Sequence, residues 1–191
     1  VLKSETDLKA ALLDIKGIKI IDTDERIYPL GEASSHLLGY VQSINADELK
    51  EKKDLGYTSQ SVIGKTGLEK IYEDRLKATD GAEIYITRED ENKVKTIAKK
   101  VAKDGETIKL TIDSSIQQKA YEQFKEDKSA TVAINPKTGE ILALVSTPTF
   151  NSNDFSLGIT VNKWDELLND EAKPLYNRTL ASYAPGSSFK P

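Results

Sequence analysis

The sequence has no cysteine, and His36 is the only histidine among its 191 residues. The absence of cysteine excludes disulfides, thiolate metal sites and a cysteine nucleophile. A Ser-His-Asp triad or a multi-histidine metal site would have only His36 to build on. We therefore interpret His36 as a structural residue and expect no metal ion or other cofactor.

The sequence also lacks a long apolar run. None approaches the roughly 20 residues that a membrane-spanning helix needs, and the longest, such as residues 141–145, have the length of a strand. The first residues do not resemble a signal peptide. Because there is no initiator methionine and the sequence ends directly after Lys190-Pro191, we expect it to be part of a longer protein, with any membrane anchor outside this sequence.

There is no excess of positive charge. The 27 lysine and arginine residues stand against 31 aspartate and glutamate residues, which gives a net charge of −4. Nucleic-acid binding needs a basic surface, so this balance argues against a nucleic-acid partner. With 38% hydrophobic and 30% charged residues, the composition is that of a folded globular protein, long enough for one ordinary domain or two small ones.

Hydrophobic periodicity predicts an α+β fold with mainly antiparallel strand pairing. We expect helices at residues 4–16, 46–53, 67–78, 113–124 and 162–169, and strands at 18–21, 83–87, 93–103, 107–112, 130–135 and 140–146. Asp104-Gly105 and residues 136–139 have the composition of hairpin turns. Ser114 and Gln117 have the spacing of a capping box. A boundary near residue 107 would divide residues 1–107 from residues 108–191.

Gly64-Lys65-Thr66 matches the end of a nucleotide-binding P-loop. That motif also requires a glycine at position 59, which is Ser59, and no strand is predicted directly before it. We therefore interpret these residues as the entry to the helix at 67–78. Asn177-Arg178-Thr179 fits a glycosylation sequon, but that pattern is common by chance and carries no weight here.

Near the end of the sequence, Ser187 stands three residues before Lys190 and directly after Pro185-Gly186. If a helix begins here, the two side chains lie on one face, one turn apart. A serine hydroxyl becomes a nucleophile when a base takes its proton, and a lysine can do so if burial and nearby cations lower its pKa. The free N–H groups at the start of the helix would stabilise a developing oxyanion. Taken alone, Ser-x-x-Lys is common by chance, and a capped surface helix is the simpler interpretation.

An ordered series of motifs changes that interpretation. The motifs are Arg26-Ile27-Tyr28-Pro29-Leu30-Gly31 running on to Leu38-Gly39-Tyr40; Gly64, Gly67, Leu68, Glu69 and Tyr72, with Leu76 and Gly81 beyond; Thr111-Ile112-Asp113 with Ile116-Gln117; residues 135–144; and Asn177-Arg178 with residues 183–190. The series resembles class B penicillin-binding proteins, which are membrane-anchored transpeptidases that cross-link bacterial peptidoglycan. The resemblance covers nearly the whole chain and is closer to Gram-positive members.

The resemblance implies a fold of two parts. Residues 1–107 would form a mixed helix and antiparallel-sheet module of the dimerisation or pedestal type. Residues 108–191 would form the first part of a serine-transpeptidase domain with a β-lactamase-like fold. The N-terminal motif residues would be structural and would join the parts: Arg26, Tyr28, Pro29, Gly31, Gly64, Gly67, Glu69 and Tyr72. At that junction we expect a buried ion pair between Arg26 and Glu69.

For the chemistry, the resemblance implies that Ser187 is the catalytic nucleophile and Lys190 the general base. Ser187 would be acylated by the D-Ala-D-Ala end of a peptidoglycan stem peptide, or by a β-lactam that mimics it. The protein would act at the extracytoplasmic face of the bacterial cell membrane. These residues do not separate a transpeptidase from a carboxypeptidase, which uses water as the acceptor. The alternative from another class is a non-catalytic pedestal or interaction module of a cell-wall or division complex.

The sequence departs from the family in lacking two active-site elements, Ser-x-Asn and Lys-Thr-Gly, which normally follow the Ser-x-x-Lys helix. Lys137-Thr138-Gly139 precedes Ser187 and falls in a predicted hairpin turn, so it is not that element. Residues 1–191 alone are therefore expected to be inactive. The incomplete catalytic sheet would expose apolar edges, which the rest of the protein, present as a second chain, or another cell-wall protein could cover.

Overall fold

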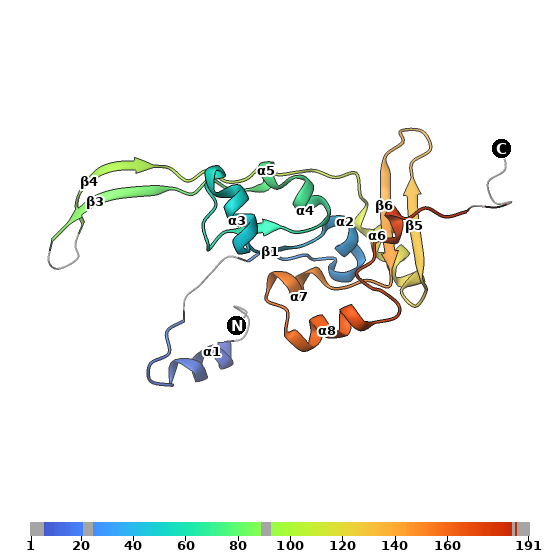
Figure 1. The fold of residues 1–191 in the computed structure, drawn as a ribbon, viewed down its shortest axis with the longest axis horizontal. Coiled ribbons are helices and arrows are strands. Elements are labelled where there is room, and N and C mark those ends of the chain that lie inside the picture. The colour runs from blue at the N-terminus through green and yellow to red at the C-terminus, as the bar shows by residue number, and fades with distance from the viewer. Residues whose placement is uncertain (1–5, 21–24, 89–92, 185, 187–191) are drawn as a thin grey trace.

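A computed structural model describes residues 6–20, 25–88, 93–184 and 186 of the chain. The molecule is elongated: a long two-stranded ribbon projects from one end of a central body, and the C-terminal segment leaves the opposite end (Figure 1). Its sheets within these residues are three antiparallel pairs: β1 (Val41–Ser43) with β2 (Val62–Gly64), β3 (Ala82–Thr87) with β4 (Lys93–Lys100), and β5 (Ser129–Ile134) with β6 (Ile141–Thr147). This content and pairing confirm the α+β prediction.

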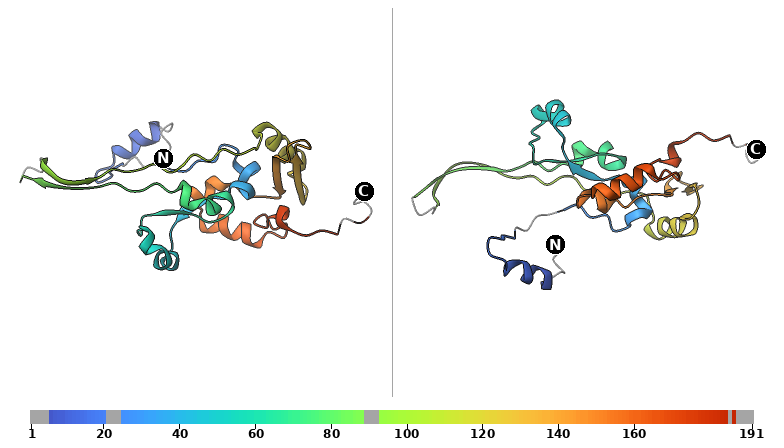
Figure 2. Two further views of the ribbon diagram at one scale, coloured as in Figure 1. Left: turned by 90° about the horizontal axis from the view of Figure 1, so that it is seen from above. Right: turned by 60° about the horizontal axis from the view of Figure 1, so that its bottom comes forward.

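The helices are short. They are α1 (Thr6–Leu13), α2 (Ser35–Leu38), α3 (Ala46–Lys52), α4 (Gly67–Ile71), α5 (Glu73–Leu76), α6 (Ser114–Phe124), α7 (Ser152–Ser156) and α8 (Val161–Asn169), with the 3₁₀ helices η1 (Gly31–Ser34), η2 (Lys53–Leu55) and η3 (Arg178–Leu180). Both views in Figure 2 place α1 apart from the body. Within the described ranges, no helix has the length and apolar character to cross a membrane.

The β5–β6 hairpin lies at the end of the body from which the C-terminal segment leaves (Figure 1). Its strands pair from Ser129–Thr147 to Ile134–Ile141, and residues 136–139 lie between them as the predicted turn. The Gly139 N–H donates to the Asn135 carbonyl at 2.8 Å, and Gly139 has φ +75°, a conformation that favours glycine. The prediction of two strands joined by this turn is confirmed.

Helix α6 packs against β6, as Figure 1 shows, but it begins differently from the prediction. Its N-cap is Asp113, whose carboxylate accepts from two backbone N–H groups of the first turn. The predicted capping box of Ser114 and Gln117 is therefore wrong. Because the cap lies one residue earlier, the Gln117 side chain is free to enter the core, where it is fully buried.

A small core surrounds β1 and β2. It consists of Ile44, Tyr57 and Ile63, with Leu49 of α3 packed against them. The helix predicted at 46–53 is confirmed as α3 followed by η2, and Asn45 caps it in a capping box with Glu48. The two strands were not predicted from the sequence, because three residues are too few for a period-two pattern to stand out.

The helix predicted at residues 67–78 is two helices. α4 ends at Ile71, and Tyr72, with φ −105° and ψ 18°, separates it from α5. Beyond the break, the Glu73 carboxylate accepts from the Gly64 N–H at 2.8 Å. This contact with β2 fixes the start of α5, so tertiary structure overrides the uninterrupted helical pattern of the sequence.

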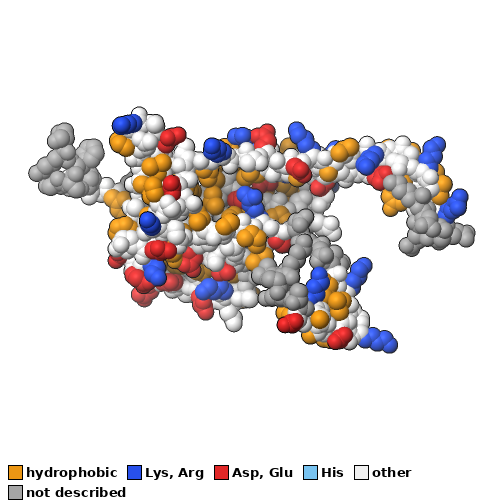
Figure 3. Space-filling model, turned by 180° about the vertical axis from the view of Figure 1, so that it is seen from behind, with side chains coloured by type: hydrophobic (Ala, Val, Ile, Leu, Met, Phe, Trp, Pro, Cys, Tyr) orange, Lys and Arg blue, Asp and Glu red, His pale blue; other side chains and the backbone are white. Residues whose placement is uncertain are grey.

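The ribbon consists of β3 and β4, which pair from Ala82–Lys100 to Thr87–Lys93 with two irregularities in register. Every residue of β3 is exposed. Figure 3 shows hydrophobic and basic side chains interleaved along this arm. The strands predicted at 83–87 and 93–103 are therefore confirmed in their main extent, and they lie outside the body.

Three local predictions are wrong. Residues 18–20 and 107–112 are not strands, and Asp104-Gly105 is not a hairpin turn, because β4 pairs back onto β3. Gly105 instead lies against α5, where a Cβ would come 1.8 Å from the Leu76 carbonyl oxygen. The Glu106 N–H donates to the Arg75 carbonyl at 2.7 Å. The extended chain at 105–106 therefore lies beside the end of α5 and does not pair with a strand there.

Candidate functional site

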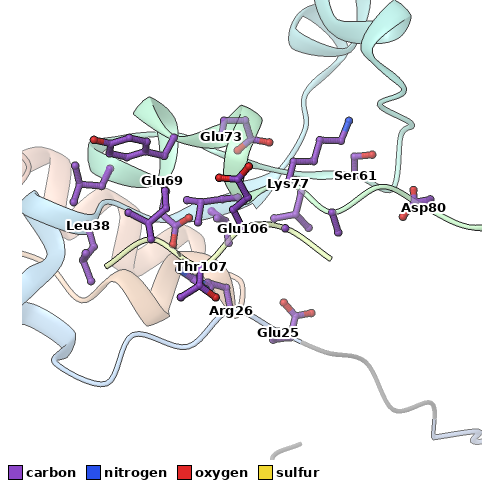
Figure 4. A pocket seen from close by; sticks show the side chains of 18 of the residues that line it. Glu25, Arg26, Leu38, Ser61, Glu69, Glu73, Lys77, Asp80, Glu106 and Thr107 are labelled. Carbon is purple, nitrogen blue, oxygen red and sulfur yellow. Dashed lines mark hydrogen bonds and ion pairs between the residues drawn. The ribbon is translucent and has the colours of Figure 1, made fainter. Parts of the chain in front are cut away.

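Segments from the two N-terminal motifs line a groove of about 830 Å³ in the body (Figure 4). Its walls come from residues 25–26, from α4 and α5, and from the extended chain at 105–110. Carboxylates are prominent in it. Figure 4 draws Glu69, Glu73 and Glu106 around the groove together with the cations Arg26 and Lys77.

The predicted ion pair between Arg26 and Glu69 is present. Arg26 Nε donates to Glu69 Oε1 at 2.8 Å. Only one partner is buried: 7% of the Glu69 side chain is exposed, against 54% of the Arg26 side chain. The prediction of a buried pair is therefore corrected to a half-buried one, in which water still solvates the guanidinium and weakens the attraction.

Tyr28 is buried beside this pair. Its phenolic oxygen accepts from the Val41 N–H at 3.0 Å, and the Arg26 guanidinium lies 6.0 Å from the centre of its ring. Burial, followed by the negative charge of Glu69, raises the pKa of Tyr28, so this phenol stays neutral further into the alkaline range than an exposed tyrosine. Tyr28 thus connects the first motif to β1.

Glycines of both motifs allow the backbones to touch. A Cβ on Gly39 would stand 1.9 Å from the Thr66 carbonyl oxygen, and a Cβ on Gly67 would stand 2.5 Å from the Gly39 nitrogen. Gly39 and Gly67 also have φ values of +79° and +59°. A Cβ on Gly64 would lie 2.3 Å from the Glu69 carbonyl oxygen. No side chain fits at these three positions, which explains the glycines of the motifs.

The other predicted motif residues shape a turn and a wall of the groove. Pro29 lies in an exposed turn, which closes where the Gly31 N–H donates to the Tyr28 carbonyl at 2.9 Å. Tyr72 lines the groove at the break between α4 and α5, with the Arg75 guanidinium 5.6 Å from its ring centre. Pro29 and Gly31 therefore take part in a turn, and Tyr72 forms part of the groove wall.

Gly64-Lys65-Thr66 begins on the last residue of a strand, β2, which was not predicted from the sequence. Lys65 Nζ pairs with Glu48 Oε2 at 2.5 Å, and the Thr66 backbone lies against Gly39. The lysine already has a carboxylate partner and the loop backbone faces protein, so this segment does not form a phosphate cradle. α4 begins at Gly67, which confirms the interpretation of the segment as a helix entry.

Nothing in the sequence singles out Glu73, yet it cross-links a wall of the groove. Its Oε1 accepts from the hydroxyl of buried Tyr57 at 2.7 Å, and its Oε2 accepts from the Gly64 N–H. Burial, followed by the hydrogen bond to Glu73, raises the pKa of Tyr57. A glutamate at an ordinary helix position gives no local signal of such contacts.

Side chains from α7 bind the backbone of the first motif. Asn153 Oδ1 accepts from the Tyr28 N–H at 2.8 Å, and Asn153 Nδ2 donates to the Tyr28 carbonyl at 3.0 Å. The buried Ser152 hydroxyl donates to the Gly39 carbonyl at 2.7 Å. Neither this helix nor these three hydrogen bonds were predicted from the sequence.

Gln117 makes the same kind of contact from α6. Its Nε2 donates to the Ala33 carbonyl at 2.6 Å and to the Leu144 carbonyl at 2.8 Å, while its Oε1 accepts from the Leu144 N–H at 2.8 Å. One amide therefore joins η1 to β6. Together with the α7 contacts, it fastens residues 28–39 to the later part of the chain through backbone atoms.

The segment that leads toward Ser187 is anchored at Arg178. The Arg178 N–H donates to Ser146 Oγ at 2.9 Å, which ties the segment to β6. The buried Arg178 guanidinium donates to three backbone carbonyls within residues 172–176. Ser187 and Lys190 themselves lie outside the described residues, so their roles stay predictions.

Lys137-Thr138-Gly139 lies in the exposed β5–β6 turn, in agreement with its rejection as an active-site element. His36 also behaves as predicted for a structural residue: its Nε2 lies 2.9 Å from the Pro174 carbonyl oxygen, and burial lowers its pKa. In the part of the chain that the structure describes, no group of three or more potential ligand side chains could hold a metal ion.

Comparisons with protein families match both parts of the chain. Residues 3–110 match the family described as the Penicillin-binding Protein dimerisation domain, and residues 129–191 match the Penicillin binding protein transpeptidase domain. The chain is 45% identical over 177 residues to Penicillin-binding protein 3 of Bacillus subtilis and 41% identical over 177 residues to Peptidoglycan D,D-transpeptidase MrdA of Acinetobacter baumannii. These alignments cover 93% and 92% of this chain but only 26% of each relative.

Solved structures share the fold. PBP2 of Helicobacter pylori, solved in complex with MreC, matches 91% of this chain with a TM-score of 0.76 and 32% identity. PBP2 of Pseudomonas aeruginosa, in complex with WCK 5153, matches 84% with a TM-score of 0.65 and 36% identity. This chain covers 32% of each of those chains. On the family matches and these likenesses, the chain belongs to the penicillin-binding proteins and matches both their dimerisation domain and their transpeptidase domain.

Proposed function

We propose that the full-length protein is a peptidoglycan D,D-transpeptidase, to which this chain contributes an N-terminal module, residues 1–107, and the start of the catalytic domain, residues 108–191. The observation that carries the proposal is the position of Ser187-x-x-Lys190 within the transpeptidase match at 129–191. Relatives that are 33 to 41% identical to this chain are named for that activity.

The reaction assigned to the site is acyl transfer. Ser187 Oγ attacks the carbonyl carbon of the penultimate D-alanine of a stem peptide while Lys190 Nζ takes the hydroxyl proton. The tetrahedral intermediate collapses by breaking the C–N bond, and the terminal D-alanine leaves with a proton on its amine. The amine of a second stem peptide then attacks the ester, which forms the cross-link and restores the serine. A β-lactam enters the first step and leaves its ring-opened acyl group on Ser187.

The contacts at Arg26, Tyr28, Gly67 and Glu69 support a structural role for the N-terminal motifs, as the junction between the module and the catalytic domain. None of these residues takes part in the acyl transfer. In this proposal the module holds the catalytic domain in place at the extracytoplasmic face of the membrane, through an anchor outside the described residues.

A role in docking a protein partner is the second function proposed for the module. The H. pylori relative was solved in complex with MreC, and the β3–β4 ribbon of this chain projects from the body with its apolar side chains exposed (Figure 3). Exposed apolar surface of this kind favours protein contact. The docking role accompanies the enzymatic one and does not replace it.

The test is acylation of the full-length protein by a fluorescent penicillin. We expect one label per molecule, found on Ser187 by peptide mass mapping, and none in Ser187→Ala. Lys190→Ala should slow acylation by about 10²–10⁴-fold, the usual loss on removing a general base. Incubation with a stem peptide and an acceptor amine should give cross-linked product; release of free acid alone would indicate a carboxypeptidase. A folded wild type that takes no label would overturn the proposal.

A further inference from the structure

The chain between α8 and the proposed nucleophile is held from two sides. On one side lies β6, where the Ser146 hydroxyl oxygen accepts a hydrogen bond from the Arg178 N–H. On the other side stands α2, a helix of the first N-terminal motif, and His36 is its contact residue. His36 Nε2 lies 2.9 Å from the Pro174 carbonyl oxygen, and the His36 carbonyl accepts from Asn177 Nδ2 at 3.3 Å.

These two contacts fall in a loop with an unusual backbone. Lys173, directly before Pro174, is the only residue other than glycine with a positive φ among those the structure describes, at 53°. The Arg178 guanidinium donates to the carbonyls of Ala172, Lys173 and Tyr176 at 2.6–3.3 Å. A left-handed conformation costs free energy at a lysine, so the loop keeps its shape because surrounding contacts determine it.

Further hydrogen bonds connect this loop to the chain that leads toward Ser187. Asn177 Oδ1 accepts from the Thr179 N–H and hydroxyl and so caps η3. The Tyr183 hydroxyl donates to the Arg178 carbonyl at 3.2 Å, four residues before Ser187. Contacts at Pro174, Asn177 and Arg178 therefore hold the chain as far as Tyr183.

We infer that His36 is a positioning residue for the acyl-transfer step: through Pro174 and Asn177 it links the N-terminal motif to the segment that carries Ser187. This inference rests on the proposed function. The carbonyl of Pro174 can only accept, so the imidazole donates through Nε2–H. The ring is fixed by an edge-to-face contact with Phe150, with the centroids 5.1 Å apart. A rigid donor of this kind sets the distance between α2 and the loop.

Two variants of His36 both carry an amide donor but differ in side-chain length, and so test whether the position of the donor matters. Glutamine carries a donor at about the position of Nε2 and should keep the contact with Pro174, whereas the asparagine amide is one methylene shorter and should lose it. Misplacement of a nucleophile by about 1 Å can cost 10²-fold in rate. We therefore expect His36→Asn to lower the first-order acylation rate constant with fluorescent penicillin by about 10- to 100-fold and His36→Gln to retain most of it, with the dissociation constant of the initial non-covalent complex unchanged.

A third variant approaches the link from the other side. Asn177→Asp keeps the oxygen that caps η3 but loses the donor to the His36 carbonyl, so it should slow acylation in the same direction. The control is Ser35→Ala, which removes a buried hydroxyl of the same helix that bonds to the Glu32 carbonyl and to Thr149 and not to the loop. It should lower the melting temperature but leave the acylation rate constant of the folded protein as in the wild type.

The outcomes are distinct. If the wild type takes no label, the proposed function fails. If the wild type is acylated and both His36→Asn and Asn177→Asp acylate at its rate, the function stands and the positioning role is wrong. Equal slowing in Ser35→Ala, or no recovery in His36→Gln, would also overturn it, because the effect would then follow stability alone. Should His36→Asn fail to fold, Asn177→Asp decides the question by itself.

Discussion

Gly39 and Gly67 lie backbone against backbone, and neither position has room for a side chain. A Cβ on Gly67 would stand 2.5 Å from the Gly39 nitrogen, and a Cβ on Gly39 would meet the peptide that precedes Gly67 at 1.9 Å. The two N-terminal motifs, whose facing glycines are 28 positions apart in the sequence, are therefore one structural unit, and the absence of side chains at these glycines lets the backbones approach this closely.

Gly67→Ala should be strongly destabilising. The methyl group overlaps backbone atoms that have no alternative rotamer, and φ is +59° at this position. We expect a loss of about 3 kcal/mol or more in the free energy of unfolding, measured by urea denaturation. Gly56→Ala is the control, because Gly56 has φ +79° but open space around it, so it should lose about 1–2 kcal/mol. Equal losses would show that the close approach contributes nothing.

Breaking the Arg26–Glu69 pair should have unequal effects from its two sides. Glu69→Gln leaves a guanidinium that water already reaches, so the expected loss is about 1 kcal/mol. Arg26→Met leaves a carboxylate that is almost wholly buried without its cation, and about 2–3 kcal/mol should be lost. Urea denaturation of both variants measures the difference. Equal losses, or a larger one for Glu69→Gln, would contradict the half-buried description.

Gln117→Met should be among the more destabilising changes in α6. The substitution keeps the approximate volume of the side chain but leaves the Ala33 carbonyl and both backbone groups of Leu144 without their partner. Buried polar groups left unpaired cost about 1–3 kcal/mol each, and a total loss of about 3 kcal/mol is expected. Gln118→Met, at the next and more exposed position of α6, should change stability by less than about 0.5 kcal/mol. Thermal melts of both variants measure the difference.

The free energy of unfolding should decrease in alkaline solution as two buried tyrosines ionise. The pKa values of Tyr28 and Tyr57 are raised above 10.0 in the folded state, chiefly by burial. The stabilisation from these neutral phenols is complete below about pH 10, the unfolded-state pKa, and is lost as pH rises from there through the folded-state values. Denaturant midpoints measured up this range should fall less steeply in Tyr28→Phe. Tyr176→Phe, at an exposed position, should follow the wild type.

Residues 1–191 alone should not form a stable acyl-enzyme. The polypeptide contains the proposed nucleophile and base but no Ser-x-Asn or Lys-Thr-Gly element after them. Without these elements it has no strand to align the acyl donor and no complete oxyanion hole. Incubation with a labelled penicillin, followed by denaturing electrophoresis, should show no stoichiometric label, whereas the full-length protein is labelled under the same conditions. A labelled Ser187 in the short chain would contradict this expectation.

Elements with strong local signals were predictable from the sequence, and those fixed by distant contacts were not. The β5–β6 hairpin has two strand-length runs and a Pro-Lys-Thr-Gly turn, and α3 has a capping box at Asn45, so local rules were sufficient. The segment at 107–112 has a strand-like alternation as well, but its place in the body depends on Gly105 meeting α5. This contact involves the backbone of Leu76, and the alternation of residues 107–112 contains no sign of it.

The residues of the candidate junction were predictable from the sequence, but their burial and most of their contacts were not. The motif series named Arg26 and Glu69 as neighbours, and they are hydrogen-bonded. The exposure of Arg26 could not be read from the sequence, since burial depends on what covers a side chain. Asn153 was missed, and Gln117 was assigned to a capping box instead of to its backbone contacts. A polar side chain that binds a distant backbone looks, in the sequence, like any polar residue at the surface.

The attachments at Asn153, Ser152 and Gln117 all end on main-chain atoms of residues 28–39. These hydrogen bonds do not use the side chains of residues 28–39, so a substitution that leaves the backbone in place would not remove them. Removing the strip altogether is another matter. In a chimera spliced at residue 108, Asn153 and Ser152 would lose these partners and Gln117 would keep only its bonds to Leu144. A graft of the catalytic portion onto a foreign N-terminus should therefore carry residues 26–40 with it.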